Sequence, residues 1–155
     1  MKKEHIEYIN FIEGIKTTIK NTHWSSVNNS EHVRMDEFAD IIAEYEDTIA
    51  EEFQGIEGQV EDNEVKPISY TYSNPKKLLN DVKEKTIELY KTLENDIEYI
   101  GIRSEIESFI HEINKYKYLF KLALRAESKV FKLTENDIKD IITETIRNYI
   151  KKMII

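Results

Sequence analysis

The chain has 155 residues and a mass of 18.4 kDa, which is the size of one domain with one core. It contains no cysteine, so disulfides, thiolate nucleophiles, iron–sulfur clusters and cysteine-bound zinc are excluded. Its formal net charge is −8 and it has no long basic tract, so DNA binding is not expected. No apolar block reaches the length of a signal peptide or a membrane span, so we expect a cytoplasmic protein without a membrane partner.

The first half of the sequence predicts two long helices, because glycine and proline are sparse and apolar residues recur at helical spacing. The first is predicted over residues 3–22, with Gly14 as an interior defect. The second is predicted from a cap at Ser30 to Gly55 or Gly58. Its apolar stripe, which we expect to face the core, consists of Met35, Phe38, Ile42, Tyr45, Ile49, Phe53 and Ile56.

Residues 58–74 lack periodicity and predict a long loop, which ends in a cap followed by a proline at the first helical position. A third helix is predicted over residues 75–99, with Ile97 in the core, and Gly101 is expected to close it. A fourth is predicted from a capping box at Ser104 to about residue 126. The sequence therefore predicts an all-α protein, a four-helix bundle whose long loop between helices two and three permits the ferritin-like crossover topology.

The last segment predicts a separate appendage. We assign residues 1–128 to the bundle and residues 129–155 to a C-terminal amphipathic helix with its own cap at Thr134. Its apolar stripe comprises Ile138, Ile141, Ile142, Ile146, Ile150 and Met153. This helix could pack on its own bundle, or residues 133–155 could dock a neighbouring subunit or a protein partner.

The face of the second helix opposite its apolar stripe carries an imidazole and several carboxylates. At about 100° per residue they share an arc of roughly 100°; they are His32, Asp36, Asp40, Asp47 and Glu51. Carboxylates so close repel one another, and a bound cation would relieve that repulsion. Imidazole and carboxylate without thiolate suit iron or manganese. The alternative is a solvated acidic face.

Another histidine, His23, lies at the end of the first helix and continues the spacing of that helix's apolar residues. This position suits a capped core histidine as well as a metal ligand. The adjacent residue is Trp24, the only tryptophan of the chain.

Together these residues form a pattern that resembles the Dps-like miniferritins, a family of the ferritin-like superfamily named for DNA protection during starvation. The pattern is His23-Trp24, then His32-Val33-Arg34-Met35-Asp36, then Asp47-Thr48-Ile49-Ala50-Glu51, with eleven positions from Asp36 to Asp47. The resemblance covers about residues 5–125 and is strongest over 21–55.

The resemblance implies a ferroxidase site across a two-fold subunit interface. His23, His32 and Asp36 would come from one subunit, and Asp47 and Glu51 from its mate. The implied metal is iron at a mono-iron or di-iron site, with manganese or zinc as possible substitutes. Trp24 would serve as an electron donor beside the iron, although it could equally be an aromatic residue packed under the interface.

The implied function is oxidation of Fe(II) by peroxide or dioxygen, with iron storage and protection against oxidative damage. The implied assembly is a homo-oligomer built on the two-fold interface, with a dodecamer as one candidate. The alternative is a non-catalytic helical adaptor, such as a phage or plasmid accessory protein. In that case the acidic stripe would be a degenerate site or hold a structural cation.

Overall fold

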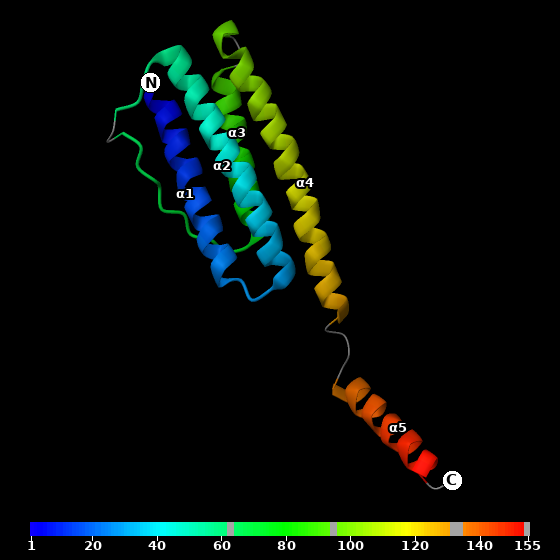
Figure 1. Cartoon of the computed structure of the whole chain (residues 1–155). Helices are drawn as coiled ribbons and strands as arrows, with labels where there is room; N and C mark the ends of the chain where they lie inside the picture. Colours follow the sequence, from blue (N-terminus) through cyan, green and yellow to red (C-terminus); the bar gives the residue numbers. More distant parts are fainter. Residues whose placement is uncertain (62–63, 94–95, 131–134, 154–155) are drawn as a thin grey trace. The chain divides into compact units, whose positions relative to one another are not determined.

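The computed structural model describes residues 1–61, 64–93, 96–130 and 135–153, and over these residues the chain forms helices and loops without a strand. The helices are α1 (Lys3–Ser25), α2 (Asn29–Glu57), α3 (Pro75–Thr92), the short 3₁₀ helix η1 (Ile97–Tyr99), α4 (Ile100–Val130) and α5 (Glu135–Met153), as Figure 1 shows. The all-α prediction is confirmed. Within the described ranges, none of the helices combines the length and the apolar character that a membrane span requires.

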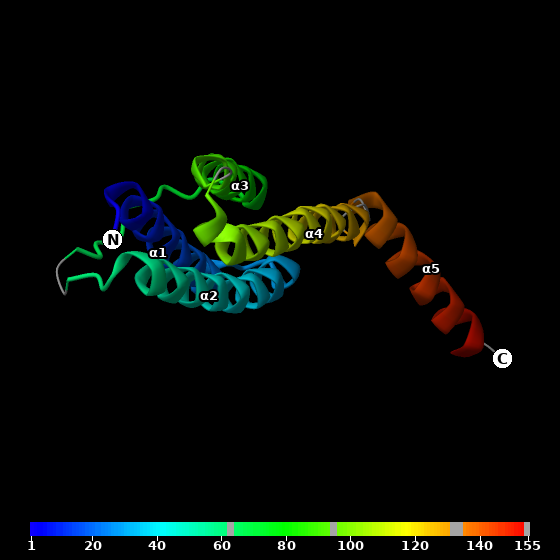
Figure 2. The same ribbon diagram turned by 90° about the horizontal axis from the view of Figure 1, so that it is seen from above.

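Helices α1 to α4 contribute to one hydrophobic core. The stripe of α2 is buried from Met35 to Phe53, as predicted, whereas Ile56 at its end is exposed. Aromatic rings join α2 to α4: the rings of Tyr45 and Phe109 stack with centroids 3.8 Å apart. Figures 1 and 2 both show α1 and α2 side by side along their length.

Contacts between the helices fix their directions. The hydroxyl of Tyr8 in α1 lies 2.9 Å from that of Tyr45 in α2 and 2.9 Å from that of Thr86 in α3. Between α3 and α4, Tyr90 donates to Glu107 at 2.6 Å and Lys83 donates to Asn114 at 2.8 Å, so these two helices are antiparallel. The pairs α1–α2 and α3–α4 are therefore each antiparallel, while α2 and α3 run in the same direction (Figure 1).

Two helices that run in the same direction need a long return connection, and the segment between α2 and α3 supplies it. It leaves α2 at Gly58, whose φ of 93° lies in a region that favours glycine. It then follows α1, where the Ile68 amide donates to the carbonyl of Asn10 at 3.0 Å. Near its end the Tyr72 hydroxyl donates to Glu31, in the first turn of α2, at 2.6 Å. The predicted crossover connection thus runs from one end of α2 to the other.

Gly14 in α1 makes this path possible. A β-carbon built on Gly14 would lie 1.9 Å from the carbonyl oxygen of Ile68, a distance that no side chain tolerates. The sequence suggested that Gly14 was an interior defect of α1. In the structure, Gly14 is the point where the crossover backbone packs against the helix. The contact is reinforced nearby, because the Lys66 amide donates to the Asn10 side chain at 2.5 Å.

Three predicted boundaries are wrong. The cap of α2 is Asn28, whose side chain accepts from the Glu31 amide at 2.7 Å, two residues before Ser30. Helix α3 ends at Thr92, and the chain turns through η1, which leaves Ile97 75% exposed. Helix α4 therefore begins at Ile100, so Gly101 and Ser104 lie inside it instead of ending one helix and capping the next. The predicted cap at Thr134 lies outside the described residues.

The chain divides into two compact units, Met1–Lys121 and Leu122–Ile155, and α4 runs from the first into the second. The second unit contains α5, whose described isoleucines are all exposed. Every buried residue of the hydrophobic core belongs to the first unit, up to Phe120.

Candidate metal centre

The short turn between α1 and α2 brings His23 and His32 together. Only residues 26–28 separate the two helices, and both helix ends are capped locally. The Ser26 amide donates to the Thr22 carbonyl at 2.9 Å, and Asn28 caps α2. A connection this short makes the two helices antiparallel neighbours, so their facing ends meet.

The two histidines hold each other in a reciprocal arrangement. Nδ1 of His23 lies 3.0 Å from the backbone oxygen of His32, and Nδ1 of His32 lies 2.8 Å from the backbone oxygen of His23. Their rings stack with centroids 3.9 Å apart and planes at 28°. We call this arrangement the histidine clasp.

The histidine clasp fixes the tautomer of both rings. A carbonyl oxygen can only accept a hydrogen bond, so each Nδ1 must carry the hydrogen and donate it. In the neutral imidazole the lone pair then lies on Nε2, which is the atom left to bind a metal. Metal-binding histidines in proteins commonly have their second nitrogen held in this way by a backbone carbonyl. The clasp therefore orients both side chains as metal ligands would be oriented.

Asp36 completes this end of the candidate site. One of its carboxylate oxygens lies 3.5 Å from Nε2 of His23 and 3.9 Å from the Lys20 ammonium. The His23 side chain is only 12% exposed, whereas that of Asp36 is 53% exposed. A largely covered imidazole thus directs its free nitrogen toward a carboxylate at the surface, with a lysine as the counter-charge. His32 lies one helical turn before Asp36 on the same face of α2.

The other two predicted ligands, Asp47 and Glu51, are exposed on α2 but distant from the histidine clasp. Asp47 follows Asp36 by eleven positions of helix, about 16 Å along the axis. One chain therefore does not bring all five ligands to one point. Among the described residues, no group of three or more histidine, aspartate or glutamate side chains is placed to hold a metal ion.

The surface between the two ligand sets is a shallow groove along α1 and α2. Ala39 and Ala43 of α2 form part of its lining, with Lys20 and Trp24 of α1. The Trp24 side chain is 68% exposed, so it is neither a core residue nor covered within the described chain. An exposed indole beside small residues is typical of a surface that contacts another molecule.

A second polar cluster, which the sequence did not reveal, joins α1 to α2 near this groove. Lys16 forms ion pairs with Glu13 and with Glu46, the latter at 2.5 Å. Burial raises the pKa of the Glu46 carboxyl to about 7, and a hydrogen bond shared with Glu13 adds to this effect. Burial acts to raise the pKa of the Glu13 carboxyl, but its hydrogen bonds with Glu46 and Lys16 outweigh burial and lower that pKa.

The spacing of Glu13 and Lys16 along one helix was a visible signal for their ion pair, since residues three apart are neighbours. Nothing in the sequence marked Glu46 as buried, because only the packing of α1 on α2 encloses it. The same holds for the histidine clasp, which depends on the geometry of the turn.

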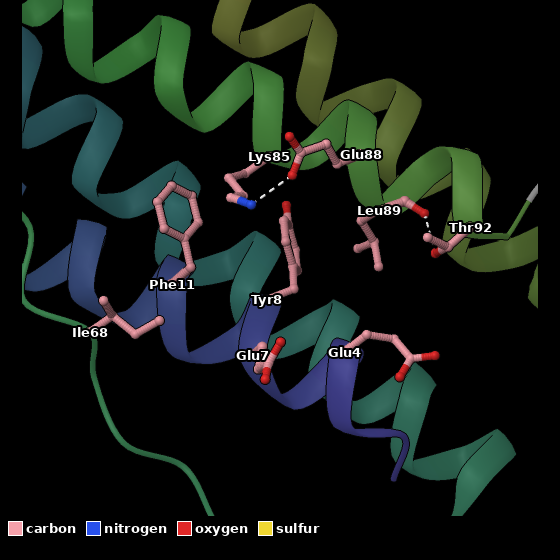
Figure 3. Close-up of a pocket in the computed structure, with 9 residues that line it drawn as sticks. All are labelled: Glu4, Glu7, Tyr8, Phe11, Ile68, Lys85, Glu88, Leu89 and Thr92. Carbon is pink, nitrogen blue, oxygen red and sulfur yellow. Dashed lines mark hydrogen bonds and ion pairs between the residues drawn. The ribbon is translucent and has the colours of Figure 1, made fainter.

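A further groove lies between α1, α3 and the crossover (Figure 3). Several of its polar groups have bonding partners: Lys85 pairs with Glu88 at 2.6 Å, and the Tyr8 hydroxyl is bonded to Tyr45 and Thr86 beneath the groove. The close-up shows Phe11, Leu89 and Ile68 around these groups. This groove therefore offers mainly apolar contact, and its described carboxylates do not form a group that could hold a metal ion.

No protein-family model, curated protein or solved structure matches the chain. The described residues form an all-helical protein in which two stacked histidines lie where α1 ends and α2 begins, one of them beside Asp36. What the chain does must therefore be argued from these residues.

Proposed function

We propose that this protein is a Dps-like miniferritin, which binds Fe(II) between two subunits and oxidises it. The observation that carries the proposal is the histidine clasp, which leaves Nε2 of His23 as a donor atom beside Asp36 and Nε2 of His32 as a second donor atom on the stacked ring. Two imidazoles and one carboxylate are a donor set that suits Fe(II) and leaves coordination positions open. The parallel α2 and α3, joined by a long crossover, agree with a ferritin-like bundle.

The second half of the proposed site comes from a partner subunit. If two copies pack with their α2 helices antiparallel about a two-fold axis near Ala43, Asp47 and Glu51 of each copy approach the histidine clasp of the other. Ala43 lies within two residues of the midpoint between His32 and Glu51, and its side chain is exposed. A small side chain at that point allows the two helices to approach closely.

The proposed chemistry follows from the donors. The carboxylates of Asp36, Asp47 and Glu51 stabilise Fe(III) more than Fe(II), because the attraction between opposite charges grows with the charge of the ion. Two Fe(II) ions supply the two electrons that reduce one hydrogen peroxide to two water molecules, with two protons taken up. Trp24 follows His23 in the chain and would contact the partner subunit. Where a site holds a single Fe(II), the Trp24 indole would supply the second electron to peroxide and be left as a radical cation.

Anaerobic titration with Fe(II), followed by peroxide, tests this proposal. The ferric absorbance should rise in the wild-type protein and fall at least tenfold in Asp47→Ala/Glu51→Ala. A matched control is Glu84→Ala/Glu88→Ala, which removes an exposed carboxylate pair of the same spacing from α3. Equal ferric absorbance in all three proteins would contradict the proposal and favour the non-catalytic adaptor.

A further inference from the structure

Helix α5, in the second unit, has an apolar face with exposed side chains. Its described large apolar side chains are between 48% and 68% exposed; they are Ile138, Ile141, Ile142, Ile146 and Tyr149. At about 100° per residue these side chains share one side of the helix. Four exposed isoleucines on one side of a helix form an apolar patch that needs a cover.

Thr145 lies in the middle of this apolar face, between Ile141 and Tyr149. Its hydroxyl donates to the Ile141 carbonyl at 2.8 Å, so its hydrogen atom is satisfied within the helix. The residue can therefore sit in an apolar contact without a buried, unpaired donor. Thr143 makes the equivalent bond to the Lys139 carbonyl at 2.7 Å but lies on the polar side of the helix.

The charges of α5 are separated along its length. Residues 135–144 contain four carboxylates and one lysine, a net charge of −3. Residues 145–153 contain three cations and no carboxylate, a net charge of +3. Acidic N-termini and basic C-termini also suit the helix dipole, but that effect is confined to the first and last turns. Asp140, Glu144 and Arg147 lie in the interior of the helix.

We infer that α5 is a self-pairing helix, which docks antiparallel on the α5 of a second copy of this chain, with Thr145 at the centre of the contact. An antiparallel pair places each acidic half beside the basic half of the other helix. A parallel pair would place −3 beside −3 and +3 beside +3, which is repulsive. The contact buries both isoleucine faces at once. This inference does not depend on the proposed iron chemistry.

Single cysteines test the geometry, because the natural chain has none. Under mild oxidation, the full-length Thr145→Cys protein should shift from monomer to disulfide dimer on a non-reducing gel. Ile141→Cys and Tyr149→Cys should each stay unlinked alone but form a mixed dimer together. In the antiparallel pair two copies of residue 141 lie about 12 Å apart along the axis, too far for a disulfide. The control is Thr143→Cys, which should not link.

Two results would overturn the inference. Linking of Ile141→Cys and of Tyr149→Cys each with itself would show a parallel pair, and equal linking of Thr143→Cys and Thr145→Cys would show random collision. A second variant covers the case in which cysteines disturb the helix: Ile142→Asp should lower the mass measured by light scattering, whereas Thr143→Asp should not. Unchanged mass in both would also contradict the pairing. Ferric absorbance is measured on the same proteins as a separate readout. A failure of α5 pairing can then be told apart from a failure of the proposed ferroxidase function.

Discussion

The carbonyl oxygen of Ile68 lies so close to Gly14 that a β-carbon there would stand 1.9 Å away. The crossover backbone is held at that point by the bond from the Ile68 amide to the Asn10 carbonyl. Neither partner can give way as a flexible side chain would. The close approach of α1 and the crossover therefore depends on the absence of a side chain at position 14.

Gly14→Ala should destabilise the protein by about 1–3 kcal/mol, the usual cost of overpacking, even though alanine favours a helix more than glycine does. The control is Gly55→Ala in α2, where a β-carbon would meet nothing within 4 Å. That change should be neutral or stabilise by up to about 1 kcal/mol. Urea unfolding of both variants measures the difference, and a stabilised Gly14→Ala protein would show that the crossover does not pack there.

The two faces of α2 should respond in opposite ways to substitution. Ile42 is fully buried, so Ile42→Ala should cost roughly 2–5 kcal/mol. Asp47→Asn should leave the metal-free protein unchanged or slightly more stable, because it relieves repulsion with Glu51 one turn away. Urea unfolding in the presence of a chelator compares them. A larger loss for Asp47→Asn than for Ile42→Ala would mean that the buried and exposed faces are reversed.

Glu46 should make the protein less stable as the pH rises. Its folded pKa of about 7 lies above its ordinary value of 4.5, so between these values the folded state holds a proton that the unfolded state has lost. Stability from this group is therefore present below pH 4.5 and lost as the pH rises through 7.

Glu46→Gln removes that dependence. The melting temperature of the variant relative to the wild type should rise between pH 5 and pH 8. Glu44→Gln, at an exposed position of the same helix, should show no such trend. If the melting temperatures of both variants change with pH as that of the wild type does, Glu46 does not titrate as described.

The sequence predicted the helices well where periodicity was long and poorly where caps decided the boundary. The stripe of α2 repeats over five turns, and burial from Met35 to Phe53 follows it. By contrast, Gly101 suggested a helix end, but Asp96 caps η1 by accepting from the Glu98 amide at 3.0 Å, and α4 follows directly. A single glycine therefore predicts a helix boundary less reliably than a capping side chain nearby does.

The candidate site was predicted in part. Exposure of Asp36, Asp47 and Glu51 followed from their angle on the helix, and the structure confirms it. The histidine clasp could not be predicted, because it depends on hydrogen bonds from side chains to backbone atoms across the turn. The same turn leaves Trp24 exposed. Whether these residues bind iron stays a prediction.

The central claim is that each iron site combines residues of two subunits, and mixing two defective proteins tests it most directly. His32→Ala/Asp36→Ala and Asp47→Ala/Glu51→Ala should each be inactive alone. Mixed dimers of the two should contain one intact site, so the mixture should recover roughly a quarter of the wild-type ferroxidase rate if subunits pair at random. If mass spectrometry shows mixed dimers while the mixture stays as inactive as either parent, the shared site is contradicted.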